Sequence, residues 1–249
     1  MKRLIAFDLD GTLAESKQPL SDEVAAWLAR LLAVADAAII SGGDWPQFEK
    51  QIASRLPPAT RRDRLWLMPT TGTKLYRFAG GAWRPVYAEL FDAGERAKIL
   101  TAFDRALADA GLAGERIWGE RIEDRGSQIT FSGLGQQAPL AAKEAWDPDR
   151  AKRTALQAAL RAALPELSIN LGGTTSIDVT RKVVDKAYGL RRLSEESGVA
   201  LEEMLFLGDA IYPGGNDYPA FTLGLDTVRV RDVAETVAVV TGIIACLGS

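Results

Sequence analysis

The chain has 249 residues, of which 47% are hydrophobic and 25% charged, and its formal net charge is -3. This is ordinary globular usage, so collagen-like, low-complexity and wholly disordered classes are excluded. Histidine is absent and Cys246 is the single cysteine, which excludes His-based triads, zinc sites built on His or Cys, and intrachain disulfides.

Charge and hydropathy also bear on location and partners. Thirty basic residues stand against thirty-three acidic ones, so nothing favours nucleic acid or an anionic membrane as a partner. Asp8 and Asp10 interrupt the first apolar run too early for a signal peptide. The most apolar stretch, 236–247, is shorter than the about 20 residues that span a bilayer. A lone cysteine fits a reducing compartment, and we expect a soluble, cytoplasmic protein.

The first third of the chain alternates short apolar runs with amphipathic stretches. Ser21 has the side chain of a helix N-cap, and apolar residues follow it at helical spacing. Strands that alternate with helices favour a parallel sheet with right-handed crossovers. The predicted elements are a strand at 4–7, a helix from 21, a strand at 37–40, a helix at about 46–56 and a strand at 65–68.

The middle of the chain has a different pattern, in which hairpins and helices are mixed. It predicts an α+β insertion over 81–182 within a core formed by 1–80 and 183–249. The predicted elements are a hairpin at 75–78 and 83–87, a helix at 95–110 with Leu100, Phe103 and Leu107 on one face, strands at 116–122 and 128–131, a helix to about 164 with Pro148 at its first position, and strands at 168–170 and 176–180.

The parallel pattern resumes after the insertion. Gly198 is expected to close a helix over 185–196, and 204–207 reads as a buried strand. Two further strands are predicted at 221–225 and 227–230. The expected fold class is therefore α/β, with a parallel sheet interrupted by a second, lid-like domain.

Two carboxylates follow the first predicted strand. Asp8 and Asp10 stand in Asp-Leu-Asp-Gly-Thr, where Gly11 allows a close approach. Open parallel sheets bind ligands at the carboxyl ends of their strands, and paired carboxylates suit a hard cation such as Mg²⁺. One carboxylate could attack phosphorus while the other handles the proton. The alternative is a solvated turn with two incidental acids.

Three other segments could join this site. Ser41-Gly42-Gly43 ends the second strand and offers a hydroxyl and amides for a phosphate, although a plain Gly-rich turn is as good an explanation. Lys186, in the first turn of a helix, reads alone as a solvated charge. Gly208-Asp209 ends a strand before a loop, 212–217, that has more acids and glycines than a connection needs.

These four segments, in this order, resemble the motifs of the haloacid dehalogenase superfamily of phosphotransferases. The resemblance covers essentially the whole chain, and within the superfamily the sequence is most similar to the phosphomannomutase branch of subfamily IIB. The loop at 208–218, Gly-Asp-Ala-Ile-Tyr-Pro-Gly-Gly-Asn-Asp-Tyr, and the cap segments at 125–135 and 172–179 carry that likeness. It implies a Rossmann-like core with an inserted α/β cap.

The resemblance also implies roles for the motif residues. Asp8 would be the nucleophile that forms an aspartyl-phosphate, and Asp10 would protonate the leaving oxygen and later activate the acceptor. Asp8, the Asp10 carbonyl and Asp209 would hold Mg²⁺. Ser41 and Lys186 would steady the phosphoryl oxygens. The remaining contacts of this half of the site would come from Gly42, Asn216 and Asp217, the last of which would orient Lys186.

From the cap, Arg125, Ser176 and Asp178 would meet the sugar or its distal phosphate. Two other substrate positions, at which the mutases of this branch carry arginines, are Gln136 and Lys143 here. An amide in place of a guanidinium loses a charge-assisted bond of roughly 1.5–3 kcal/mol, and lysine lacks the bidentate fork. The loop arginine after the first motif likewise corresponds to Lys17. Whether another cap arginine compensates is open for Arg116, Arg121 and Arg181.

Because these departures weaken the hold on a second phosphate, the sequence predicts a Mg²⁺-dependent phosphatase acting on a sugar phosphate or a similar small metabolite. The first alternative is a phosphomannomutase, which interconverts mannose 6-phosphate and mannose 1-phosphate. The second alternative is a non-enzymatic phospho-acceptor switch. The expected partner is a small phosphorylated substrate, without nucleic acid or membrane, and a homodimer through the cap is left open.

Overall fold

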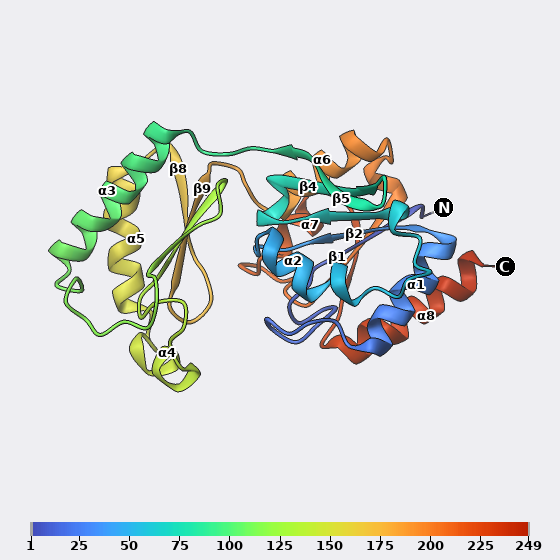
Figure 1. The fold of residues 1–249 in the computed structure, drawn as a ribbon, viewed down its shortest axis with the longest axis horizontal. Helices are drawn as coiled ribbons and strands as arrows, with labels where there is room; N and C mark the ends of the chain where they lie inside the picture. The colour runs from blue at the N-terminus through green and yellow to red at the C-terminus, as the bar shows by residue number, and fades with distance from the viewer. Residues whose placement is uncertain (1, 249) are drawn as a thin grey trace. The chain divides into compact units, whose positions relative to one another are not determined.

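The computed structural model describes residues 2–248, which form two units, each with its own sheet and hydrophobic core (Figure 1). The parallel-sheet unit comprises the chain up to Ala88 and from Val184 onward. The inserted unit is Glu89–Val183. The α/β class predicted from the sequence is confirmed.

Seven strands form the sheet of the first unit, in the order β11-β10-β1-β2-β3-β4-β5. β1 lies inside the sheet between β10 and β2, and all its residues are fully buried. The parallel strands are β1 (Leu4–Phe7), β2 (Asp36–Ile40), β3 (Leu65–Met68), β10 (Met204–Gly208) and β11 (Asp226–Arg229), and β4 (Lys74–Ala79) and β5 (Ala82–Ala88) add an antiparallel edge.

Both faces of this sheet are covered by helices, which explains why its strands are apolar runs without alternation. Ile5 and Phe7 of β1 pack on one side into a core with α1 (Asp22–Val34), α2 (Trp45–Gln51) and α8 (Val233–Leu247). Leu4 and Ala6 pack on the other side, in a core with residues of α6 (Lys186–Ser197) and α7 (Tyr218–Thr222). The carboxyl ends of the parallel strands therefore share one edge between two helical layers.

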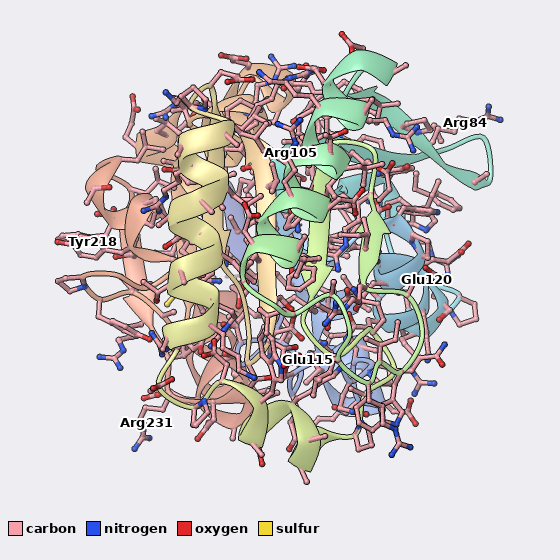
Figure 2. All side chains as sticks on the ribbon, turned by 90° about the vertical axis from the view of Figure 1, so that its left-hand side faces the viewer. Arg84, Arg105, Glu115, Glu120, Tyr218 and Arg231 are labelled. Carbon is pink, nitrogen blue, oxygen red and sulfur yellow. The ribbon has the colours of Figure 1, made fainter. Side chains whose placement is uncertain are left out.

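The inserted unit has a four-stranded antiparallel sheet in the order β6-β7-β9-β8. Apolar side chains such as Phe131 and Ile177 pack against α3 and α5, which lie side by side over the strands (Figure 2). The alternate side chains of β7 and β9 are polar and face the other way. The elements are α3 (Ala93–Asp109), β6 (Ile122–Asp124), β7 (Gln128–Ser132), α4 (Leu140–Trp146), α5 (Ala151–Ala163), β8 (Leu167–Leu171) and β9 (Ser176–Arg181).

The predicted hairpin forms, but it belongs to the parallel-sheet unit. Trp66 of β3 pairs with Arg77 of β4, so β4 and β5 extend the first sheet instead of opening the second domain. The boundary consequently falls after Ala88, where the sequence placed it at 80, while the second junction at Val183 agrees within one residue. A hairpin pattern alone does not say which sheet it joins.

Several other predicted elements are wrong in detail. The segment 221–225 is not a strand, because α7 and its following turn occupy it and Phe221 is exposed. Of the predicted strand 116–122, only Ile122 belongs to a strand, and the Arg121 side chain donates to the carbonyls of Leu112 and Gly133. Leu100 lies outside the buried face of α3, and α4 was not predicted.

The helix expected to begin at Pro148 begins instead at Ala151. The Asp147 carboxylate accepts hydrogen bonds from the backbone amides of Lys152 and Arg153, and so satisfies the first turn from outside the helix. Among the described residues, no helix has both the length and the hydropathy to cross a bilayer.

Helix α6 packs on the turn after β3 through two glycines. Gly72 has φ +84°, and a Cβ at this position would lie 2.5 Å from the Cα of Gly189. A Cβ on Gly189 would in turn lie 3.0 Å from the carbonyl oxygen of Thr71. Backbone thus meets backbone, and this close approach fixes α6, whose first residue is Lys186, against the strand ends.

Gly72→Ala should lower the free energy of unfolding by about 3 kcal/mol, from left-handed strain and overpacking together. Gly81→Ala is the matched control, because Gly81 also has a positive φ (+80°) but no atom within 4 Å of a built Cβ. It should lose only about 1 kcal/mol. Urea unfolding measures both, and equal losses would contradict the close packing of α6.

Candidate active site

The carboxyl end of β1 turns sharply into the first motif. The Asp8 amide donates to the Leu207 carbonyl at 3.0 Å, which prolongs the pairing of β1 with β10. The chain then makes a tight turn, whose backbone amides donate hydrogen bonds to the Leu9 carbonyl. Gly11 has φ +87°, and a Cβ there would lie 2.8 Å from Oδ2 of Asp209. Glycine is therefore required for the two acidic segments to meet.

A buried lysine joins the first and last motifs. Asp185 caps α6, and the next residue, Lys186, donates from Nζ to Oδ1 of Asp8 at 2.5 Å and to Oδ1 of Asp217. All three side chains are at most 5% exposed. The second oxygen of Asp217 accepts the Ala210 amide at 2.9 Å. Asp217 thus bonds through one oxygen to the ammonium group and through the other to the backbone.

Burial and mutual charge change the protonation of this cluster. Burial raises the pKa of the Asp8 carboxyl to about 6 against the lowering effect of Lys186, and the charge of Asp217 adds a smaller rise. Burial and then Asp217 also raise the pKa of Asp209. Burial lowers the pKa of Lys186, but the two carboxylates outweigh it and raise that pKa overall. The lysine is firmly charged, and Asp8 takes up a proton at a higher pH than an ordinary aspartate, even with Lys186 beside it.

Three acids of this edge could hold a metal ion. Asp8, Asp209 and Asp217 each offer a carboxylate oxygen, and these oxygens lie within 4.8 Å of one another. Both oxygens of Asp217 already accept hydrogen bonds, from Lys186 and Ala210. Asp8 and Asp209 are therefore the better donors for a hard cation, and oxygen donors of this kind suit such an ion.

Asp10 stands apart from that acidic group. Its Oδ1 accepts a hydrogen bond from the Lys17 amide at 2.6 Å, so the side chain is held by the following turn rather than by the metal-binding acids. The predicted ligand from this residue is its carbonyl, which remains a prediction.

Ser41 and Gly42 follow β2, the neighbour of β1. The turn after β3 braces them, because Thr71 donates its amide to the Ser41 carbonyl at 2.9 Å. Ser41 is 5% exposed and Gly42 is exposed. Asn216 is exposed on the loop that ends in Asp217. The second motif thus lies at the same sheet edge as Asp8, which is the arrangement expected for contacts to a phosphoryl group.

The predicted substrate residues of the inserted unit share the polar side of its sheet. Thr130 of β7 donates to Oδ1 of Asp178 on β9 at 2.7 Å, and burial raises the pKa of that carboxyl. Ser176 is paired with Ser132 in the same register. Arg125 donates to Glu123 at 2.7 Å. Sequence reasoning missed Thr130 and Glu123, although the period-two polar alternation of these strands was a usable signal.

The other two predicted substrate residues lie beyond β7. The Gln136 amide donates to the Glu120 carbonyl, and Lys143 of α4 donates from Nζ to the Gln136 carbonyl at 3.1 Å. These bonds tie together two loops and α4. They are contacts within the inserted unit.

The three arginines considered as replacements for the two missing cap arginines also have partners within the inserted unit. Arg121 donates to two backbone carbonyls, and Arg181 pairs with Glu95 at 2.7 Å. The Arg116 guanidinium lies over the Trp118 ring, 4.7 Å from its centroid. Each guanidinium already has a partner, so none is an obvious substitute.

Known proteins share this fold. The chain aligns with Plasmodium falciparum IMP-nucleotidase with a TM-score of 0.71 at 17% identity, covering 99% of this chain and 69% of that one. Aspergillus fumigatus trehalose-6-phosphate phosphatase aligns with a TM-score of 0.59 at 21% identity, covering 99% and 92%. The fold and the motif residues define an enzyme of the haloacid dehalogenase superfamily, acting on phosphate esters.

Sequence comparison defines the branch. The family model described as "Eukaryotic phosphomannomutase" matches residues 25–245, so the chain belongs to that family. The phosphomannomutase of Saccharomyces cerevisiae is 27% identical, covering 88% of this chain and 84% of its own length. Human phosphomannomutase 1 is 24% identical, covering 93% and 89%. The resemblance stated from the motifs is confirmed, and a non-enzymatic switch is no longer a useful alternative.

Lys186→Met should lower the free energy of unfolding by about 3–5 kcal/mol at about pH 8, because Asp8 and Asp217 stay buried without their cation. Burial already raises the pKa of Asp8 to about 6, and without the lysine that pKa would rise further above its unfolded value, so the folded state would bind more protons. The stability of the variant should then fall as pH rises, and the loss should be smaller at about pH 5.

Lys74→Met is the control, since Lys74 pairs with Asp44 at 2.5 Å and both side chains keep some exposure, 10% and 20%. Its loss should be smaller and less dependent on pH. Urea unfolding at the two pH values measures both variants. A Lys186→Met loss that does not change with pH would contradict the electrostatic account.

Proposed function

We propose that this protein is a phosphohexomutase of the phosphomannomutase type, which moves a phosphoryl group between the 1- and 6-positions of mannose through an aspartyl-phosphate. The observation that supports it most is the buried Asp8–Lys186–Asp217 cluster beside Asp209, in a chain that matches the phosphomannomutase family over nearly its whole length. The curated relatives carry that name, and they favour this function over the phosphatase predicted first from the sequence.

In the proposed reaction an oxygen of Asp8 attacks phosphorus as the bond to the sugar oxygen breaks, and Asp10 gives its proton to that oxygen. In the return step the acceptor hydroxyl loses its proton to Asp10 and takes the phosphoryl group from Asp8. Lys186 neutralises charge on the phosphoryl oxygens in a low-dielectric site. The Ser41 hydroxyl and the amides near Gly42 are proposed to hold the same oxygens.

The donor set fits Mg²⁺. Asp8 and Asp209 have carboxylate oxygens free of Lys186, and the Asp10 carbonyl is the third proposed ligand. A bound Mg²⁺ would supply charge neutralisation for the transferring group. Its charge would also lower the pKa of the Asp8 carboxyl from the raised value of about 6, and so favour the ionised nucleophile.

The inserted unit is proposed to act as a substrate-specificity cap. Ser176 and Asp178 lie two residues apart on the polar side of its sheet, and the charge of Arg125, just after β6, acts on the Asp178 carboxyl. A carboxylate accepts from sugar hydroxyls, and a guanidinium donates to a phosphate. The proposed substrate is therefore a phosphorylated sugar. Asn216 and Asp217, which we also propose as substrate residues, lie on the loop after β10.

Hydrolysis is the second candidate, and a specific observation favours it. Gln136 and Lys143 stand where two arginines are expected in a mutase, while Arg121 and Arg181 are bound to acceptors of their own unit. A weakly held bisphosphorylated sugar would dissociate before it reorients in the site. Water would then accept the phosphoryl group from the aspartyl-phosphate.

With mannose 1-phosphate, a hexose bisphosphate activator and Mg²⁺, we expect isomerised product to exceed free phosphate. Gln136→Arg should raise the product-to-phosphate ratio by about tenfold, because it recovers a charge-assisted contact. Gln137→Arg adds the same charge one residue further on, at an exposed position, and should leave the ratio nearly unchanged. Phosphate release that dominates in the wild type would overturn the mutase and establish the phosphatase.

A further inference from the structure

The turn after the first motif holds the Asp10 side chain with a backbone amide. Lys17 donates its N–H to Oδ1 of Asp10 at 2.6 Å, and it does so from a left-handed conformation with φ 61°. A lysine there is strained by about 1 kcal/mol or more. The turn must therefore be stabilised from outside if this amide is to keep its direction.

Gln51, the last residue of α2, supplies that support. Its side chain is 2% exposed and donates from Nε2 to the Gln18 carbonyl at 2.6 Å. Its own backbone carbonyl accepts the Leu20 amide at 2.9 Å. Gln51 therefore hydrogen-bonds to the residues on both sides of Pro19, in the segment that directly follows the strained Lys17.

A glutamine at this position lowers the stability of the folded state. Oε1 of Gln51 is buried and has no hydrogen-bond partner in the described chain. A buried acceptor without a partner is destabilising, and an apolar side chain of similar size would avoid the penalty. Its neighbours on the helix, Phe48 and Ile52, are fully buried in the core. Packing alone would favour a methionine or leucine at this position.

We propose that Gln51 is a positioning residue for phosphoryl transfer. It fixes the turn so that the Lys17 amide aims the Asp10 carboxyl at the oxygen that leaves phosphorus. The step it serves forms the bond from Asp8 to phosphorus, breaks the bond from phosphorus to the sugar oxygen, and passes the Asp10 proton to that oxygen. The inference rests on the acid–base role given to Asp10 in the proposed function.

The test compares two substrates of the same protein. An aryl phosphate with a stable leaving phenolate needs little help from an acid, whereas a sugar phosphate needs a proton on its leaving oxygen. For Gln51→Met we expect kcat on the sugar phosphate to fall about tenfold or more, with KM little changed, and turnover of the aryl phosphate to stay within about twofold. The thermal midpoint should stay the same or rise, because the orphaned acceptor is gone.

Thr60→Val is the matched control. Thr60 belongs to the same unit, is 8% exposed, and its Oγ1 is another buried atom without a partner among the described residues. Its replacement removes an orphaned polar atom without touching the turn. It should change neither substrate's kcat while affecting the midpoint in the same direction.

Asp10→Ala tests the acid–base role of Asp10 separately from the positioning role of Gln51. Selective loss on the sugar phosphate would support the acid–base role, and equal loss on both substrates would overturn the proposed function of Asp10. If Asp10→Ala is selective but Gln51→Met slows both substrates alike, or slows neither, the positioning role is wrong. A Gln51→Met protein with a clearly lowered midpoint would also overturn it, since the residue would then be structural.

Discussion

The ammonium group of Lys186, buried between the carboxylates of Asp8 and Asp217, is the interaction on which the rest of the structure depends. A buried charge is tolerable only when its partners are held in place, and removing one partner leaves the others uncompensated. β1, the start of α6 and the loop after β10 must therefore meet at one point. The backbone contact of α6 with the turn after β3 and the absence of a Cβ at Gly11 let them approach closely enough.

The carboxylates at this edge of the sheet differ in their hydrogen-bond partners. Asp217 has both oxygens engaged and serves the lysine, while Asp8 and Asp209 keep oxygens that can bind a cation or phosphorus. Asp10, one turn away, is held by a backbone amide that Gln51 supports through the Gln18 carbonyl. Similar carboxyl groups thus have different surroundings, and under the proposed reaction these surroundings would let one site combine a nucleophile with an acid.

Local patterns predicted the strands at 4–7 and 65–68 well, because a run of apolar residues buried on both faces has few alternatives. They failed at 116–122, where Arg121 bonds to carbonyls of other segments, and at 221–225, where Pro219 lies in the first turn of a short helix. Such contacts leave no mark on local periodicity. Lys186 is the clearest case for the site: alone it read as a surface charge, and only the family motifs placed it with Asp8, 178 residues away.

Direct detection of the phosphorylated residue would test the central claim most sharply. The protein would be mixed with a hexose bisphosphate and Mg²⁺, quenched, and treated with borohydride, which reduces an aspartyl-phosphate to homoserine. The account predicts homoserine at position 8 in the digested protein, dependent on substrate and absent from Asp8→Asn. A protein that turns over its substrate while Asp8 stays unmodified, or that becomes modified at another carboxylate, would contradict it.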